Sequence, residues 1–198
     1  MSILVDFMRH GEAEGGRAYR GHGVDDPLSD KGWWQMSARV DHHCPWTHIV
    51  SSPMRRCRAF AEELAGRHEL PLMIEDRFKE VGFGRWEGKT PDEIVAQWPE
   101  EYTDFYRDPV NCRPQGAEPL EAFYARVGSA MTDMVDKYEG HHVLVVAHAG
   151  VIRAALTNAM NAAPGCMYRF RIPYAAISRL SYDEKGWFVE FVNGQLTE

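Results

Sequence analysis

The sequence lacks the features that mark a membrane, secreted or repetitive protein. No apolar run approaches the 18 or so residues of a bilayer-spanning helix, and residues 1–7 lack the basic segment of a signal peptide. The four cysteines, at positions 44, 57, 112 and 166, form no C-x-x-C pair, and 198 residues need no disulfide framework. No repeat, low-complexity tract or linker divides the chain. We therefore expect one domain over residues 1–198, free thiols and a cytoplasmic location.

An excess of positive charge is also missing. Asp and Glu number 29 against 22 Lys and Arg, so the formal net charge is −7. Such a chain is poorly suited to hold a nucleic-acid backbone or a membrane surface by bulk electrostatics, and we expect neither as a partner. Arginine strongly outnumbers lysine, which favours forked, bidentate recognition of oxyanions. A phosphate ligand would require these arginines to gather in one place.

The pattern of apolar segments predicts an α/β fold. Strands are predicted at 3–8, 47–51, 70–75, 143–147, 176–182 and 187–192. Helices are predicted at about 28–43, 53–67, 90–98, 99–107, 120–139 and 149–161. Because strands alternate with helices, we expect a mostly parallel sheet covered on both faces, with the last hairpin as an antiparallel edge. The short helices and prolines at about 90–120 form a helical insertion.

Polar side chains follow three of the predicted strands where each strand ends. The first strand leads into Arg9 and His10, the fourth leads into His148, and the second leads into Arg56 at a helix start. Because the carboxyl ends of parallel strands meet at one edge of a sheet, we expect these groups to lie together. Two histidines, arginines and a helix N-terminus at one edge predict a phosphoryl-binding pocket.

These blocks resemble the histidine phosphatase superfamily, also called the phosphoglycerate mutase-like family. The matching blocks are RHGE at 9–12, SSPMRR at 51–56, Glu80 ahead of FGRWEG at 83–88, and HAGVIR at 148–153. They occur in family order across almost the whole chain. The resemblance implies a three-layer α/β/α sandwich and a metal-independent, histidine acid-type phosphatase that needs no cofactor and forms a phosphohistidine.

The resemblance also implies roles for individual residues. His10 is the expected nucleophile, with its other ring nitrogen donating to a backbone carbonyl, and Arg9, Arg56 and His148 are expected to hold the phosphate oxygens. Glu12, Glu80 and Glu87 are all candidate proton donors by composition, and the family match selects Glu80. Arg55 and Arg153 are expected to be surface or rim cations.

The chain departs from the family pattern beside the first block. Many relatives carry a phosphate-binding asparagine a few residues after RHGE, whereas this chain reads EGGR at 14–17. We expect glycine amides or Arg20 to replace that contact. Ala149 occupies a position where glycine is frequent, and its backbone N–H stays available. Arg20, Gly21, Trp86 and Ala149 are therefore the predicted substrate-binding residues.

Several segments look most like the α-ribazole phosphatase branch, whose members remove the 5′-phosphate of α-ribazole phosphate in cobalamin synthesis. These segments are residues 20–29, 52–57, 83–88 and 116–127. The candidates for stacking on a benzimidazole base are Phe83, Trp86, Trp98, Phe105 and Tyr106. The predicted partner is a small-molecule phosphomonoester, and a homodimer is left open. The alternatives are a broad-specificity phosphatase, a phosphoglycerate mutase, a metal-dependent hydrolase and a catalytically inactive phosphate-binding scaffold.

Two other groups of residues have more ordinary interpretations. His42, His43, Cys44 and His48 could bind a metal, but adjacent residues at a helix end rarely supply a fixed coordination geometry. Cys57 lies beside Arg56, and its helical position favours a small buried residue over a reactive thiol. We therefore expect no metal site.

Overall fold

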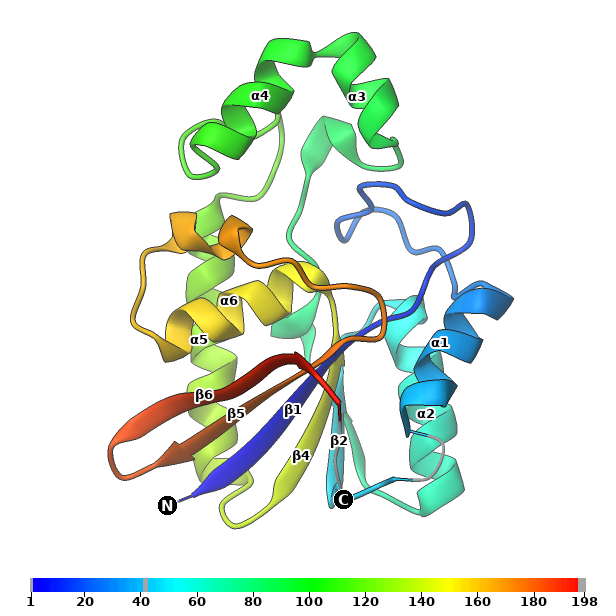
Figure 1. The fold of residues 1–198 in the computed structure, drawn as a ribbon, viewed down its shortest axis with the longest axis vertical. Helices are drawn as coiled ribbons and strands as arrows, with labels where there is room; N and C mark the ends of the chain where they lie inside the picture. Colours follow the sequence, from blue (N-terminus) through cyan, green and yellow to red (C-terminus); the bar gives the residue numbers. More distant parts are fainter. Residues whose placement is uncertain (1, 41–42, 196–198) are drawn as a thin grey trace.

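A computed structural model describes residues 2–40 and 43–195, and its core is one six-stranded sheet (Figure 1). The strands are β1 (Ile3–Arg9), β2 (His48–Ser51), β3 (Leu72–Ile74), β4 (His142–Ala147), β5 (Ile177–Asp183) and β6 (Gly186–Gly194). Their order across the sheet is β3-β2-β4-β1-β5-β6. The four strands from β3 to β1 are parallel, and β5 and β6 are antiparallel. The predicted mixed sheet with an antiparallel edge is confirmed.

Helices cover both faces of this sheet. They are α1 (Asp30–Val40), α2 (Arg55–His68), α3 (Pro91–Gln97), α4 (Pro99–Arg107), α5 (Leu120–Lys137) and α6 (Ala149–Ala159), with short 3-10 turns η1 (Asp76–Phe78), η2 (Gly84–Trp86) and η3 (Pro164–Arg169). Figure 1 shows α1 and α2 on one side of the sheet and α5 and α6 on the other. This is the predicted three-layer sandwich.

The alternation of side chains along β1 explains the two layers of core. Phe7 packs into the larger apolar cluster with α5 and α6, whereas Met8 packs into the cluster of α1 and α2. Successive residues of a strand point to opposite faces, so a continuous apolar strand supplies both cores at once. The buried strand β4 behaves in the same way.

The helices α3 and α4 lie together beyond the end of the sheet, at the top of Figure 1. Thr90 caps α3 through a reciprocal capping box with Glu93, and Pro91 occupies the first turn, where its missing N–H costs nothing. Ile94 and Phe105 bury their side chains toward the main body of the chain. These two helices lie within the segment at about 90–120 for which a helical insertion is predicted.

The boundaries of the elements differ from prediction at α2. The helix begins at Arg55 rather than Pro53, because Met54 has extended backbone (φ −66°, ψ 136°) as its N-cap. Across the residues that the structure describes, no helix has both the length and the apolar character needed to cross a membrane.

Candidate active site

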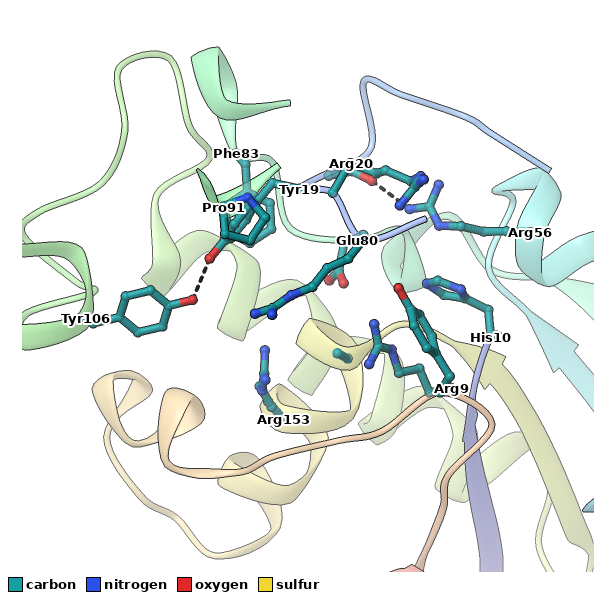
Figure 2. A pocket seen from close by; sticks show the side chains of 15 residues that line it. Arg9, His10, Tyr19, Arg20, Arg56, Glu80, Phe83, Pro91, Tyr106 and Arg153 are labelled. Carbon is teal, nitrogen blue, oxygen red and sulfur yellow. Dashed lines mark hydrogen bonds between the residues drawn. The ribbon is translucent and has the colours of Figure 1, made fainter. Parts of the chain in front are cut away.

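A cavity of about 210 Å³ opens where β1 and β4 end (Figure 2). Arg9 lies opposite Ala147 in the parallel register, so the residues that follow both strands emerge at one edge. The cavity is lined by Arg9, His10, Arg17, Ala18, Tyr19, Arg20, Gly21, Arg56, Glu80, Phe83, Pro91, Tyr106, Ala149, Arg153 and Tyr174. An acidic chain therefore gathers five arginines at one cavity.

His10 is held in the tautomer that a nucleophile requires. Its Nδ1 lies 2.6 Å from the carbonyl oxygen of Gly11, which can only accept, so Nδ1 carries the proton. The Nε2 lone pair is then available, as predicted. Burial, followed by the charges of Arg56 and Arg9, lowers the pKa of His10 well below 6.5. The imidazole is therefore neutral near pH 7.

Arg56 and Arg9 each keep one buried nitrogen unpaired beside His10. Arg56 is 1% exposed, and its two Nη atoms donate to the carbonyls of Val24 and Gly21 at 3.0 and 2.8 Å. The Nη1 of Arg9 donates to the carbonyl of Ile172 at 2.6 Å. The Nε of both arginines has no partner among the described residues. Buried guanidinium nitrogens without acceptors are costly unless an anion binds there.

Arg20, one of the groups expected to replace the phosphate contact of the family asparagine, lines the cavity. Its Nε donates to Asp26 at 2.8 Å and its Nη2 to the carbonyl of Glu14 at 2.5 Å, so the guanidinium orientation is set. Gly15 and Gly16 do not line the cavity. Gly21 has φ +53°, and a Cβ there would lie 1.9 Å from Glu87 Oε1, so glycine is required.

Glu80 is the single carboxylate lining the cavity within the described part of the chain. Its Oε1 accepts the N–H of Val81 at 2.9 Å and its Oε2 the N–H of Gly150 at 3.2 Å. The other two candidates have different roles. Glu12 pairs with the ammonium of Lys31 at 3.1 Å, and Glu87 accepts the N–H of Phe83 beneath Gly21. Of the three candidate proton donors, Glu80 alone lines the cavity.

His148 lies behind His10 rather than on the cavity wall. Its ring is fully buried and meets the His10 ring edge to face, with centroids 5.2 Å apart. Its Nε2 shares a 2.7 Å hydrogen bond with Ser52 Oγ, so this nitrogen is directed at Ser52. Burial, then the charge of Arg56, lowers the pKa of His148 well below 6.5. Ala149, the next residue, lines the cavity at the start of α6.

The prediction for Trp86 is wrong. This side chain is fully buried, lies outside the cavity lining, and donates from Nε1 to Glu101 at 2.7 Å. It packs against the rings of Tyr19, Tyr102 and Phe105, because the η2 turn directs it into the core. Phe105 is also fully buried, and Trp98 packs against Arg85 away from the cavity. Of the five expected stacking residues, Phe83 and Tyr106 line the cavity.

Several cavity residues were absent from the sequence-based prediction. Tyr19 and Tyr106 join their hydroxyl groups at 2.5 Å, and this bond links the loop after β1 to α4. Tyr174 stacks on Arg9 with the guanidinium 4.1 Å from the ring centre. Arg153, expected at the rim, lines the cavity, and its spacing of four residues from Ala149 on one helix could have indicated this. No sequence signal marks Tyr174.

The described residues include no group of three or more His, Cys, Asp or Glu side chains arranged to hold a metal ion. The metal alternative involved His42, which lies outside the described residues. His48 packs its ring against that of His141, with centroids 4.4 Å apart. Cys57 is buried, and burial raises the pKa of its thiol, as expected for a structural cysteine.

The family model of the histidine phosphatase superfamily (branch 1) matches residues 5–195, and the chain belongs to this family. Among curated proteins, it is 31% identical over 176 residues to a bifunctional protein of Mycobacterium tuberculosis, covering 87% of this chain and 48% of that protein. The chain thus spans about half the length of this relative.

Relatives named for α-ribazole are more distant in sequence and similar in length. The adenosylcobalamin/α-ribazole phosphatase of Salmonella typhimurium is 26% identical over 182 residues, which cover 90% of both chains. The crystal structure of the α-ribazole phosphatase from Shigella flexneri superimposes with a TM-score of 0.81 at 22% identity, covering 100% of both chains. That structure shares the fold with this chain.

Proposed function

We propose that this protein hydrolyses phosphomonoesters through a phosphohistidine intermediate on His10. The observation that carries the proposal is that His10 is a neutral imidazole, held in one orientation with its Nε2 lone pair free, beside two buried arginines. The unpaired Nε atoms of Arg9 and Arg56 lie in the same site, buried from water. Phosphoryl transfer requires mainly positioning and charge stabilisation, and these residues supply both.

In the first step, the Nε2 lone pair of His10 attacks the phosphorus of the substrate. A nitrogen–phosphorus bond forms as the bond from phosphorus to the ester oxygen breaks. The arginines neutralise the charge on the phosphoryl oxygens. Glu80, in its protonated form, gives its proton to the leaving oxygen, and an alcohol departs.

In the second step, water attacks the phosphohistidine and restores the enzyme. Glu80, now a carboxylate, takes a proton from the water as its oxygen bonds to phosphorus. The nitrogen–phosphorus bond breaks, its electron pair returns to Nε2, and inorganic phosphate is released. Ser52 and the buried His148 hold His10 in position from behind. His148 shares a hydrogen bond with Ser52, and its ring packs edge to face against the ring of His10.

The narrower substrate assignment is α-ribazole 5′-phosphate. Its support is the resemblance of the motifs, the names of the Salmonella and Shigella relatives, and the aromatic rings of Phe83 and Tyr106 at the cavity. A small-molecule substrate also agrees with the size of the cavity. This assignment concerns the substrate only and is tested separately from the chemistry.

The chemistry is tested with p-nitrophenyl phosphate. Wild-type protein should release nitrophenol at undiminished rate in excess chelator, and His10→Ala should release none above background. Rapid quenching should trap an acid-labile phosphoenzyme in the wild type only. Phosphate binding without turnover of any phosphomonoester would favour the inactive scaffold, and loss of activity in chelator would favour a metal-dependent hydrolase.

The substrate is tested with a panel that contains α-ribazole 5′-phosphate, sugar phosphates and nucleotides. A clear preference in kcat/KM for α-ribazole 5′-phosphate would support the narrow assignment. Conversion of 3-phosphoglycerate to its isomer in the presence of a bisphosphoglycerate primer, without phosphate release, would support the mutase alternative.

A further inference from the structure

Glu80, the proton donor of the proposed reaction, lies on a segment without regular secondary structure. Residues 79–83 lie between the turns η1 and η2 and belong to no helix or strand. The backbone N–H and C=O groups of such a segment need hydrogen-bond partners from elsewhere in the chain. The position of Glu80 therefore depends on the side chains that bind this backbone.

One guanidinium, that of Arg126 on α5, binds three carbonyls of this segment and of the turn before it. Its Nη1 donates to the carbonyls of Arg77 and Lys79 at 2.5 and 2.9 Å, and its Nη2 donates to the carbonyl of Glu80 at 3.2 Å. The guanidinium also stacks on the ring of Phe123, with its carbon 4.5 Å from the ring centre. Because a guanidinium is planar and presents its donors in a fixed geometry, these contacts hold the segment against α5.

Glu118 orients this guanidinium and also binds the segment directly. Its carboxylate accepts hydrogen bonds from Nε and Nη2 of Arg126 at 2.8 and 3.0 Å, and both side chains are mostly buried. The same carboxylate accepts the N–H of Gly82 at 3.1 Å. Burial raises the pKa of Glu118, but the hydrogen bond and the charge of Arg126 bring it below 4.5. Glu118 is therefore ionised near pH 7 and forms a bidentate, charge-assisted pair with Arg126.

Two more side chains bind the same segment, each through one carbonyl. His22 Nδ1 donates to the carbonyl of Glu80 at 2.9 Å, and Arg113 Nη2 donates to the carbonyl of Gly82 at 2.9 Å. Arg126 makes three such contacts and orients Glu118 for a fourth. The pair of Arg126 and Glu118 therefore contributes most to holding this backbone.

The pair acts from outside the cavity at His10. Glu80 lines that cavity, whereas Arg126 and Glu118 do not, so neither can touch a substrate bound there. The Glu80 carboxylate accepts only backbone N–H groups among the described residues, those of Val81 and Gly150. No described side chain hydrogen-bonds to it, and its position therefore follows that of its own backbone.

We propose that Arg126 and Glu118 are positioning residues for the proton donor of this enzyme. They hold the backbone on either side of Glu80, so that its carboxylate reaches the leaving oxygen of a substrate whose phosphate lies at His10. The proposal rests on the phosphatase function proposed above and adds two residues that act through Glu80. A proton donor works only within hydrogen-bonding distance, and a displacement of about 1 Å costs up to about 10²-fold in rate.

The experiment compares two esters whose leaving groups differ in their need for a proton. p-Nitrophenolate is a weak base and leaves without a proton, whereas the strongly basic alkoxide of benzyl phosphate must be protonated as it leaves. The readout is kcat/KM, because it covers only the steps up to departure of the leaving group and excludes the later attack of water. Arg126→Gln should lower this value by about 10- to 100-fold for benzyl phosphate and change it little for p-nitrophenyl phosphate. Glu80→Gln should show the same pattern.

Three comparisons separate positioning from a general loss of structure. Arg179→Gln removes an arginine from the buried Asp6 cluster, outside the cavity lining, so it should lower stability and keep the wild-type ratio of the two kcat/KM values. In the Glu80→Gln background, Arg126→Gln should lower the ratio no further, because both changes remove the same proton transfer. Arg126→Lys keeps the charge without the planar fork and should recover only part of the ratio.

The outcomes distinguish this proposal from the proposed function. If the wild type hydrolyses neither ester, the phosphatase function fails. If Arg126→Gln lowers both esters equally, leaves both unchanged or adds its full effect to Glu80→Gln, the positioning role is wrong and the phosphatase function stands. An equal fall of the ratio in Arg179→Gln would have the same meaning.

A second variant covers the case in which Arg126→Gln does not fold. Glu118→Gln keeps an oxygen that can accept the N–H of Gly82 and loses the charge that orients Arg126. It should lower the ratio of the two kcat/KM values in the same direction. A wild-type ratio in this variant would overturn the proposal.

Discussion

Buried charge occurs in two regions of the part of the chain that the structure describes, and the two are organised in opposite ways. On the face of β1 toward α1 and α2, Asp6 is fully buried and accepts hydrogen bonds from Trp46, His142 and Arg179 at 2.7–3.0 Å. At the end of the same strand, Arg9 keeps an unpaired Nε atom, and so does the nearby Arg56 of α2. The first cluster satisfies its charge internally, and the second leaves its charge open to a ligand.

The difference shows which buried charges hold the fold and which serve a ligand. Removal of one member of a satisfied cluster leaves its partners unpaired, so the cost falls on stability. Removal of an open cation takes away a ligand contact, so the cost falls on activity. The two regions should therefore respond differently to substitution and to pH.

The largest expected effect is that of Asp6→Asn. Arg179 would lose its carboxylate partner in a buried cluster, and the free energy of unfolding should fall by about 3–5 kcal/mol. Urea denaturation measures this loss. The control is Glu184→Gln in the turn between β5 and β6, an exposed side chain, which should stay within about 0.5 kcal/mol of wild type. A stable Asp6→Asn protein with lowered activity would contradict the conclusion that the Asp6 cluster contributes to stability rather than to activity.

The next effect is that of Arg56→Lys. A lysine keeps the charge and loses the planar fork with its Nε, so kcat should fall by about 10²–10³-fold, as for one lost oxyanion donor. The melting temperature should fall less than in Asp6→Asn, because the change weakens hydrogen bonds to two carbonyls but leaves no buried charge without its partner. Steady-state hydrolysis and thermal unfolding of the same preparation measure both quantities. Full activity in this variant would contradict the role of Arg56.

A smaller effect should follow from Gly150→Ala. A Cβ at this position would lie 2.2 Å from Glu80 Oε1, so the carboxylate must move away from the N–H of Gly150. Misplacement of a proton donor by about 1 Å costs up to about 10²-fold in rate. The matched control is Gly66→Ala in α2, where a Cβ meets nothing within 4 Å. That control should gain about 0.4–1 kcal/mol of stability and keep its activity.

The smallest expected effect is a difference between the two regions in how their contribution to stability depends on pH. The pKa values of His10 and His148 lie well below 6.5 in the folded chain, whereas the unfolded chain binds these protons near 6.5. Below that pH the unfolded state binds more protons, so stability falls by up to about 1.4 kcal/mol per pH unit for each histidine. Urea denaturation at pH 7.5 and 5.5 measures this loss, which should be smaller in His10→Ala.

The Asp6 cluster should respond only in stronger acid. Burial alone would raise the pKa of Asp6, but hydrogen bonds from His142, Arg179 and Trp46 bring it below 3.8. Its contribution to stability is present above about pH 3.8 and is lost as the pH falls through the folded pKa.

The histidine prediction has its own contrary outcome. An equal loss of stability between pH 7.5 and 5.5 in His10→Ala and in wild type would show that His10 is not a source of that loss.

Much of the fold and of the chemistry could be predicted from local patterns. The apolar strands, the Thr90–Pro91 helix start and the final hairpin follow from periodicity, capping and turn residues, which act over a few neighbours. His10, Arg9 and Arg56 could be placed at one site because motif blocks at strand ends converge in a parallel sheet, whereas Glu80 was selected by its match to the family pattern. The aromatic residues could not be sorted, since burial of Trp86 and exposure of Tyr106 depend on how the η2 turn and α4 pack.

The sheet, the acidic character of the chain and the placement of a histidine at the end of β1 could all be predicted from the sequence alone. Those features depend on residue type and spacing along the chain. Three other features follow from the packing of distant segments: His148 faces Ser52, the Asp6 carboxylate has hydrogen-bond donors, and Arg153 shares a cavity with Arg9. Such features depend on contacts between segments far apart in the chain. Ser52 and His148, for example, are 96 residues apart in the sequence. Side-chain direction at such distances is set by packing, which no local pattern encodes.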